Sequence, residues 1–466
     1  MREFCGVYGI YSYESDSLSK MVYYGLFALQ HRGQESAGIA VADGKNIKFH
    51  TGMGLCAVVF NEEILSNLNG GHIACGHVRY STTGSSTIEN AQPIIMDSKF
   101  GPIALSHNGN LVNSNELTME LKGQGYNFKG TTDSEVMAVL ISRSDEDTIE
   151  KAVISMCKRV QGAYALVIMT KDKLIAVRDP NGIRPLCIGR HGSSYVISSE
   201  SAGLDVIGAD FTRDVSNGEI IVIDEDGLRS ITYAPRAKKA LCAFEFIYLA
   251  RPDSKLDGRT VYEVRTTMGK YLAKENKVDA DIVIGVPDSG LSAAIGYAQE
   301  SKIPFAEGLI KNRYIGRTFI QPSQAIRDLG VKLKLNPIRD IVRGKKLVVI
   351  DDSIVRGTTS KQIVKILRDA GAREVHMRIS SPPILFPCFY GIDTPSKAEL
   401  IAGTMGVEGV RKFLDADSLA YLSIRNLVDS ISLPKNNLCL ACLNGNYCVK
   451  IPEAVQKVSL FFKKGR

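Results

Sequence analysis

Residues 345–360 read KKLVVIDDSIVRGTTS, an apolar run followed by two acids and a loop rich in hydroxyl groups. The apolar run, 346–350, is typical of a buried strand, and residues 361–371 after the loop have the periodicity of a helix. Upstream, IVIGVPDSG (282–290) precedes an alanine-rich helical stretch in the same way. Strand, loop and helix repeating in this order predict a parallel, doubly wound α/β sheet from about residue 279 onward.

The loop in this stretch suits a phosphorylated sugar. Ligands of open α/β sheets bind at the carboxyl ends of the strands, and a glycine-containing loop before a helix offers backbone N–H groups and a positive dipole end to a phosphate. Asp351 and Asp352 can meet sugar hydroxyls or hold Mg²⁺ through oxygen. The alternative is an ordinary strand-to-helix turn in which the two acids only cap the helix.

The composition is that of a folded protein of several domains, because the 466 residues are 44% hydrophobic and 23% charged. No run of about 18 apolar residues occurs, so we expect no membrane partner. The net charge of +7 is scattered without blocks, which favours small anions over nucleic acid. The opening MREFCGVYGIYSYE is too short and too acidic for a signal peptide, and we therefore expect a cytoplasmic protein with reduced cysteines.

The first roughly 230 residues have a different rhythm. Short β-type runs alternate with Gly, Asn and Ser, and helical stretches interrupt them. This spacing predicts a largely antiparallel sheet system, and thus a domain unlike the one that follows. We expect strands at 5–11, 73–77, 103–106, 163–169 and 195–198, and helices at 17–29, 134–141 and 148–160.

Cys5 follows the short segment Met1 to Phe4 and precedes the apolar run GVYGIY. A thiol is a weak nucleophile and needs a base beside it. Removal of Met1 to Phe4 would free the α-amine of Cys5, whose ordinary pKa of about 7.7 to 8.0 makes it a base on the same residue. The alternative is a buried structural cysteine on the first strand.

Four more motifs follow Cys5 in sequence order. They are LQHRGQESAGIA (29–40), GHVRYSTTG (76–84), SHNGNL (106–111) and TTDSE (131–135). Together with CGVYGIY they resemble the class II glutamine amidotransferases, whose glutaminase domain is an N-terminal nucleophile hydrolase with a four-layer α-β-β-α sandwich. The resemblance implies that residues 1–4 are a leader peptide that is removed and that residues 5–230 form the glutaminase domain.

The resemblance assigns roles to six residues of these motifs. Arg79 would bind the glutamine α-carboxylate as a planar fork, and Asp133 the α-ammonium. The Asn108 side chain and the Gly109 N–H would form the oxyanion hole. Each has a structural alternative: Asn108 and Gly109 as a hairpin turn, Asp133 as a helix N-cap, and Arg79 in a surface ion pair. The loop beside the cysteine would add two glutamine-binding residues, Arg32 and Gly33.

VVIDDSIVRGTTS (348–360) resembles the phosphoribosyl pyrophosphate motif of the type I phosphoribosyltransferases. The resemblance implies that the loop binds this substrate and that residues 231–435 form the phosphoribosyltransferase domain. It also implies that Ser289 of VPDSG joins Asp351 and Asp352 at a Mg²⁺ ion. The substrate-binding residues that it assigns to the loop are Asp351, Asp352, Ser353, Arg356, Gly357, Thr358 and Thr359.

The basic segment KNRYIGRTFIQP (311–322) lies between these two motifs. It resembles the lid that closes over the substrate in the same family, which makes Lys311, Arg313 and Arg317 contacts of the anionic substrate. Taken alone, such a segment is typical of a solvated surface strip.

The C-terminal tail, 436–466, carries a CxxC pair, and two other cysteines stand alone among apolar residues upstream. A cytosolic CxxC can be redox-active, bind zinc or do neither. LCAFEFIYLARPDS (241–254) and SPPILFPCFYGID (381–393), however, resemble those amidophosphoribosyltransferases that hold a [4Fe–4S] cluster by four thiolates. The implied ligands are Cys242, Cys388, Cys439 and Cys442. We interpret the other cysteines, Cys448 among them, as packing or incidental residues.

The resemblance covers nearly the whole chain and implies one reaction. Glutamine, phosphoribosyl pyrophosphate and water would give 5-phosphoribosylamine, glutamate and pyrophosphate, the first step of purine synthesis. It further implies an ammonia passage between the domains, feedback inhibition by purine nucleotides and a homotetramer. Three alternatives stay open: a sugar-phosphate aminating enzyme with an isomerase module, a regulator that senses phosphoribosyl pyrophosphate and carries a DNA-reading helix pair, and an inactive paralogue.

Overall fold

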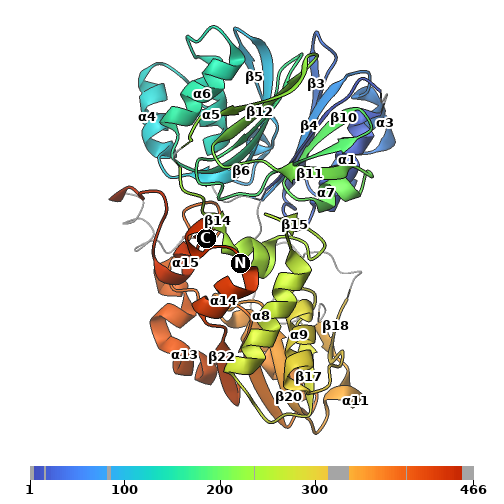
Figure 1. Ribbon diagram of the computed structural model, residues 1–466, viewed down its shortest axis with the longest axis vertical. Helices are drawn as coiled ribbons and strands as arrows, with labels where there is room; N and C mark the ends of the chain where they lie inside the picture. The colour runs from blue at the N-terminus through green and yellow to red at the C-terminus, as the bar shows by residue number, and fades with distance from the viewer. Residues whose placement is uncertain are drawn as a thin grey trace.

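The protein is described here by a computed structural model in which two α/β bodies lie one above the other (Figure 1). Within the part of the chain that the structure describes, no helix is long and apolar enough to cross a membrane. The described residues are 5–14, 17–80, 85–235, 237–312, 335–394 and 396–453.

Two antiparallel sheets pack face to face in the first body. The strands are β1 (Gly6–Tyr11), β2 (Ser36–Ala42), β3 (Ile47–Met53), β4 (Ile73–Arg79), β5 (Ile94–Ser98), β6 (Gly101–Leu111), β7 (Gly162–Met169), β8 (Leu174–Arg178), β9 (Cys187–His191), β10 (Ser194–Ser198), β11 (Asp210–Asp214), β12 (Glu219–Asp224) and β13 (Gly227–Thr232). One sheet has the order β11-β9-β10-β1-β4-β2-β3, and the other β13-β12-β8-β7-β6-β5. Apolar side chains of both sheets, such as Val7 and Val167, form one core between them.

Helices cover the outer faces of both sheets, which gives the predicted four-layer α-β-β-α sandwich. They are α1 (Leu18–Ala28), α2 (Cys56–Val59), α3 (Glu62–Asn67), α4 (Ser114–Gly123), α5 (Asp133–Ser142), α6 (Ile149–Arg159) and α7 (Ala202–Asp205), with a short 3-10 turn, η1, at Ile88–Asn90. Val22 and Leu26 of α1 are four residues apart and share a core with Tyr8 of β1. Val153 of α6 packs in the core that covers β7.

The second body contains the predicted doubly wound parallel sheet and three two-stranded sheets. The strands of this body are β14 (Leu241–Cys242), β15 (Lys255–Leu256), β16 (Arg259–Thr260), β17 (Ile282–Gly285), β18 (Leu309–Lys311), β19 (Leu335–Pro337), β20 (Lys346–Asp351), β21 (Glu374–Ile379), β22 (Ser418–Tyr421) and β23 (Leu438–Cys439). Its helices are α8 (Val261–Glu275), α9 (Leu291–Ser301), α11 (Arg339–Val342), α12 (Thr358–Asp369), α13 (Ile401–Leu414), α14 (Ile424–Ile431) and α15 (Ala441–Asn444), with a π-helix η2 (Glu245–Leu249) and 3-10 turns η3 (Lys397–Glu399) and η4 (Lys435–Asn437).

The parallel sheet has the order β17-β20-β21-β22, with helices on both faces. Successive residues of β20 point to opposite faces, so Val348 belongs to the core under α8 and α9, and Val349 to the core under α12 and α13. Residues 261–275, part of the stretch from 231 to 278 that the sequence suggests as a bridge, form α8, which packs against α9.

The two bodies share an apolar core at their junction. Ala163 and Ile183 of the first body belong to the same buried cluster as Leu241 and Phe244 of the second. The junction therefore contains packed apolar side chains, and it brings the end of β14 close to the first body.

Candidate functional site

Cys5 lies directly before β1 and is buried, with 8% of its surface exposed. Its Sγ is 3.6 Å from the carbonyl oxygen of Tyr80, the residue after β4. Burial raises the pKa of the thiol to about 11, although the Tyr80 hydrogen bond and the charge of Arg79 act to lower it. Near neutral pH the thiol is therefore protonated, and it needs a base to become a nucleophile.

Two predicted glutamine ligands lie near this thiol. Arg79 ends β4 and Asp133 begins α5, and the charges of both act on Cys5. Both are buried, and Asp133 Oδ2 accepts a hydrogen bond from Leu111 N at 2.8 Å. Arg79 does form an ion pair, with Glu35 at 3.7 Å, but the pair is not at the surface. The N-cap of α5 is Thr132 rather than Asp133. A guanidinium and a carboxylate near one thiol match the two charged ends of an amino acid.

Asn108 and Gly109 lie inside β6, opposite Ala165 and Tyr164 of β7, so they are not a hairpin turn. Asn108 is fully buried, and neither atom of its side-chain amide has a hydrogen-bond partner among the described residues. Gly109 has a φ of +153°, and a Cβ there would lie 2.0 Å from the Ala163 carbonyl oxygen. Leaving a buried amide unpaired costs about 1 to 3 kcal/mol, and an oxyanion would supply the missing partner.

Arg32 is engaged within the protein. Its Nε donates to the Cys5 carbonyl oxygen at 3.1 Å, and its Nη atoms donate to Glu200 and Glu245. Burial lowers the pKa of Arg32, but the two carboxylates outweigh burial and raise it above the ordinary value. Gly33 packs so tightly that a Cβ on it would lie 2.5 Å from a carbonyl group of β4. Both residues hold the surroundings of Cys5 in place, and their direct contact with glutamine stays a prediction.

The loop after β20 lies at the carboxyl edge of the parallel sheet, beside the loop after β17. Ser289 of the latter donates a hydrogen bond to Asp352 Oδ1 at 2.6 Å. The N-cap of α12 is Gly357, whose φ of +74° is a left-handed conformation that favours glycine. Neither acid caps the helix, so the capping role that the alternative gave them is wrong. Binding of a phosphate at this loop stays a prediction. Thr358 and Thr359, in the first turn, are exposed to solvent.

Asp351 and Asp352 are buried next to each other, with 7% and 6% of their surfaces exposed. Burial, and then the neighbouring Asp352, raise the pKa of Asp351 well above its ordinary value, so a cation would stabilise the pair. Asp352 also accepts a hydrogen bond from the Ser353 hydroxyl. In the described ranges, no three His, Cys, Asp or Glu side chains are grouped as ligands of one metal ion. Mg²⁺ commonly takes only one or two carboxylates and fills its shell with water and substrate phosphates, so these oxygens fit it.

Two of the predicted anion contacts are paired with carboxylates. Arg356 Nε donates to Glu399 at 3.1 Å, and Lys311, at the end of β18, forms an ion pair with Asp288. These pairs are exposed, so water screens them and a polyanion can compete with the carboxylates. The other two predicted contacts of the lid, Arg313 and Arg317, lie outside the described residues.

The four cysteines predicted to hold a cluster converge at the junction of the bodies. β14 and β23 pair in parallel, with Cys242 opposite Cys439. The thiols of Cys242, Cys388 and Cys442 are close enough for their charges to interact, and burial raises the pKa of Cys242 to about 12. The exposed Cys448 is in hydrogen-bond contact with Cys439. These contacts bring the four thiols into one region of the junction, and thiolates are the ligands that a [4Fe–4S] cluster takes. In this region, as elsewhere in the described ranges, no three of them are grouped as ligands of one metal ion, so the cluster stays a prediction.

Two buried acids near Cys5 were not anticipated from the sequence. Glu200 and Glu245 are both fully buried and both pair with Arg32. One signal was present: Glu245 stands alone in the apolar run 241–250, where an acid must find a buried partner.

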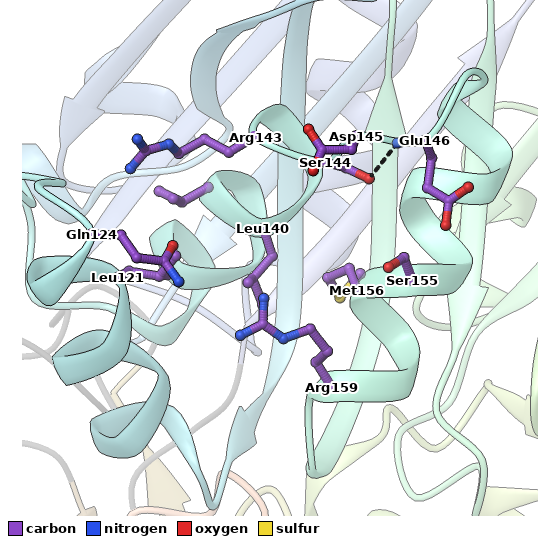
Figure 2. A pocket seen from close by; sticks show the side chains of 11 residues that line it. Leu121, Gln124, Leu140, Arg143, Ser144, Asp145, Glu146, Ser155, Met156 and Arg159 are labelled. Carbon is purple, nitrogen blue, oxygen red and sulfur yellow. Dashed lines mark hydrogen bonds between the residues drawn. The ribbon is translucent and has the colours of Figure 1, made fainter.

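A pocket of about 500 Å³ opens on the outer helical layer of the first body, between α4, α5 and α6 (Figure 2). Charged residues such as Arg143 and Glu146 line it beside apolar ones. Arg159, at its rim, is paired with Glu120. None of the predicted site residues lines this pocket, so it is separate from both sites.

Each of the two bodies matches a known protein domain. A glutamine amidotransferase domain model matches residues 77–206, and a phosphoribosyl transferase domain model matches residues 259–380. The amidophosphoribosyltransferase of Synechococcus elongatus is 50% identical over 467 residues, which cover 99% of this chain and 94% of that protein. The chain belongs to the amidophosphoribosyltransferase family. The member from Methanocaldococcus jannaschii is 51% identical over 464 residues, 96% of this chain and 98% of that protein.

Two solved structures resemble the chain over nearly its whole length. A glutamine phosphoribosylpyrophosphate amidotransferase from B. subtilis, complexed with ADP and GMP, has a TM-score of 0.91 at 48% identity and covers 96% of this chain and 98% of its own. A second, described as the allosteric regulatory enzyme of purine biosynthesis, has a TM-score of 0.92 at 46% identity and covers 99% and 100%. The predicted fold, family and enzyme class are thereby confirmed.

Proposed function

We propose that the chain transfers the amide nitrogen of glutamine to C1 of phosphoribosyl pyrophosphate and forms 5-phosphoribosylamine, glutamate and pyrophosphate, in the first step of purine synthesis. The observation that carries the proposal is the buried amide of Asn108, which has no hydrogen-bond partner in the part of the chain that the structure describes. It lies on β6, which packs against the strand that follows Cys5. An amide in this state suits an oxyanion hole, and a site for an activated ribose phosphate lies on the same chain.

Glutamine hydrolysis would begin once the leader is removed and the α-amine of Cys5 takes the thiol proton. The sulfur attacks the carboxamide, and the Asn108 side chain and the Gly109 N–H stabilise the oxyanion of the tetrahedral intermediate. The proton passes to the departing nitrogen, ammonia leaves, and water cleaves the thioester to glutamate and a restored thiol. Arg79 and Asp133 hold the two charged ends of the substrate.

Ammonia must then travel to the second site without meeting bulk water, where it would be protonated at neutral pH and lose its lone pair. The apolar cluster that joins Ala163 and Ile183 to Leu241 and Phe244 supports a dry route at the junction. These side chains offer no proton to a passing ammonia molecule.

The second site would bind phosphoribosyl pyrophosphate on the loop from Asp351 to Thr359, with the phosphate on the N–H groups that begin α12. Asp351, Asp352 and Ser289 would hold Mg²⁺, which when bound stabilises the charge that develops on the departing pyrophosphate. Purine nucleotides carry the same ribose phosphate and would compete for this loop. The B. subtilis relative complexed with ADP and GMP supports that expectation.

The four thiolates of Cys242, Cys388, Cys439 and Cys442 would hold a [4Fe–4S] cluster. Their convergence, and the pairing of β23 with β14, support the assignment. The cluster would tie the tail to the junction, because the reaction involves no redox substrate. A homotetramer in the cytoplasm, without membrane or nucleic-acid partners, completes the proposal.

The proposal is tested by measuring glutamate and pyrophosphate from purified protein with glutamine, phosphoribosyl pyrophosphate and Mg²⁺. We expect equal amounts of the two products, and synthesis from added ammonia when glutamine is absent. A requirement for another sugar phosphate would favour the aminating enzyme, and binding without turnover would favour the regulator or the inactive paralogue. The intact mass should lack residues 1–4, and full activity of chains that keep them would contradict the role of the α-amine.

A further inference from the structure

Glu245 is a fully buried acid that begins the π-helix η2 of the second body. Its carboxylate accepts hydrogen bonds from Nη1 and Nη2 of Arg32 at 3.1 and 3.0 Å, and from Nη1 of Arg184 at 3.3 Å. Both arginines belong to the first body. One carboxylate of the second body therefore holds two guanidinium groups of the other, and we call Arg32, Glu245 and Arg184 the Glu245 clamp.

On one side, the clamp reaches the nucleophile. Arg32 Nε donates to the carbonyl oxygen of Cys5 at 3.1 Å, and the same guanidinium pairs with Glu200. Glu200 in turn accepts hydrogen bonds from the Ser254 hydroxyl at 2.6 Å and from Arg251 N at 2.9 Å. The backbone orientation of Cys5 is thus set by groups from both bodies.

On the other side, the clamp reaches the loop beside the predicted oxyanion hole. Arg184 donates from Nε and Nη2 to the carbonyl oxygen of Tyr390, at 3.1 and 2.6 Å. The next residue, Gly391, lies so close to Gly109 that a Cβ on it would be 3.0 Å from the Gly109 carbonyl carbon and oxygen. A shift of this loop would therefore move Gly109 or leave it unsupported.

The position of Glu245 is itself constrained. Arg265 of α8 donates from Nε to the Phe246 carbonyl and from Nη2 to the Ala250 carbonyl, both at 2.8 Å. These two bonds fix η2 to the frame of the second body. π-Helical turns are rare and are often found at functional sites.

We infer that Glu245 is a positioning residue for glutamine hydrolysis, which makes the alignment of Cys5 and Gly109 depend on the docking of the second body. The inference deepens the proposed function and rests on it. The alternative is a purely structural role, in which the Glu245 clamp only stabilises the junction. Buried ion pairs are weak evidence for net stability. Here Arg32 Nε donates to the carbonyl of Cys5 itself, and Arg184 Nε to the carbonyl of the residue before Gly391, which packs against Gly109.

The test is the isosteric change Glu245→Gln, which keeps the shape of the side chain and removes its charge. We expect kcat/KM for glutamine to fall about 10- to 100-fold, the loss that follows a small misplacement of reacting groups. Alkylation of the Cys5 thiol by a chloroketone analogue of glutamine, followed by intact mass, should slow by the same factor. Synthesis from ammonia should stay within about twofold of wild type, because it bypasses the first site.

Glu219→Gln is the matched control. Glu219 is also a buried carboxylate with a two-pronged arginine partner, Arg213, at 2.8 and 2.7 Å, but this pair does not contact the clamp. It should leave the alkylation rate of Cys5 unchanged.

Two further variants separate a positioning role from a role in stability alone. Arg184→Met and the double variant Glu245→Gln with Arg184→Met should lose about as much glutamine activity as Glu245→Gln alone, because the three residues act as a unit. Additive losses would overturn the inference. So would a wild-type alkylation rate in Glu245→Gln, or a parallel fall of glutamine-dependent and ammonia-dependent synthesis. If the wild-type protein itself is not alkylated at Cys5, the proposed function has failed rather than the clamp.

Discussion

The glutaminase site and the phosphoribosyl loop differ most in their exposure to water. Cys5 and Asn108 are buried. In the loop, Asp351 and Asp352 are buried as well, but Arg356, Thr358 and Thr359 face solvent. The first site holds its polar groups ready inside a sheet sandwich, and the second presents a helix N-terminus to an anion from solution. The difference matches the chemistry, because one site must keep ammonia and an oxyanion from water and the other must capture a polyanion.

The two sites also lie on different bodies, so each can be broken while the other is measured. Under the proposed function, added ammonia would replace glutamine as the nitrogen donor and bypass the first site. The ratio of glutamine-dependent to ammonia-dependent synthesis therefore shows which of the two sites a substitution has damaged.

The largest effect is expected from Cys5→Ala. Glutamine-dependent synthesis should fall by on the order of 10,000-fold or more, because the nucleophile is gone. Synthesis from ammonia should remain largely intact, since the second site is untouched. Product assays with each nitrogen donor measure both. Equal loss of the two activities would contradict separate sites.

Asn108→Ala should cost about 100- to 1,000-fold in glutamine kcat, the usual loss of one oxyanion-hole donor. Asn113→Ala is the matched control, because Asn113 is also buried but bonds Arg159 O and Gln161 N, each at 2.9 Å. The control should lower the melting temperature and leave the donor ratio unchanged. Asn108→Ala should change that temperature less, because its amide has no partner to lose among the described residues. If Asn108→Ala instead lowers the melting temperature more than Asn113→Ala and leaves the donor ratio unchanged, Asn108 has no role in catalysis.

Asp352→Asn should impair both activities by on the order of 100-fold, because it weakens the site that both nitrogen donors share. Asp369→Asn, which changes an exposed acid paired with Lys365 at the far end of α12, should have no such effect. Titration of each variant with Mg²⁺ would show whether the loss is one of metal affinity. A loss confined to glutamine-dependent synthesis would contradict the assignment of Asp352 to the phosphoribosyl pyrophosphate site.

The cluster is tested by comparing Cys442→Ser with Cys448→Ser. We expect the first to lose both its iron and the brown absorption at about 400 nm that iron–sulfur centres show. The second should keep both, because Cys448 is exposed and only contacts a ligand. Activity should fall less than in the variants above. Zinc in place of iron in the wild-type protein would remove the cluster assignment.

The smallest effect concerns the burial of the first site. Burial lowers the pKa of His77, on β4, to about 3. In the unfolded chain the histidine binds a proton below about pH 6.5, whereas in the folded protein it stays neutral. Its contribution to the free energy of unfolding is therefore fully present above about pH 6.5 and is lost as the pH drops toward about 3. Between pH 6.5 and 5 we expect a loss of about 2 kcal/mol in the free energy of unfolding.

Urea unfolding at several pH values measures this slope. It should be smaller in His77→Asn and unchanged in the control His191→Asn, which alters an exposed histidine. Equal slopes in all three proteins would show that this histidine is not the source of the pH dependence.

Local sequence patterns predicted most of the elements that carry the sites. The run 346–350 and its loop became β20 and the approach to α12, and the predicted helix at 148–160 became α6. These elements have strong hydrophobic periodicity and clear turn residues, so the local sequence is sufficient to predict them. The predicted site residues Asn108 and Asp133 stood in recognisable motifs for the same reason.

The ion cluster around Arg32 was missed. Its partners come from residues about 170 and 210 positions away, and a lone buried acid carries no local pattern that names its partner. The motif that contains Arg32 predicted a contact with glutamine, which stays a prediction, but it gave no sign that the guanidinium also binds the Cys5 carbonyl and two carboxylates.

The amino-acid sequence by itself determined the order of the two bodies, their sheet types and the chemical identity of the groups at each site, because period, turn residues and motifs act over short stretches of chain. Only the tertiary structure decided which polar groups would be left without water. Burial removed the solvent from Cys5 and Asn108 and placed Glu245 between two arginines of the other body, and these long-range contacts depend on how distant segments pack.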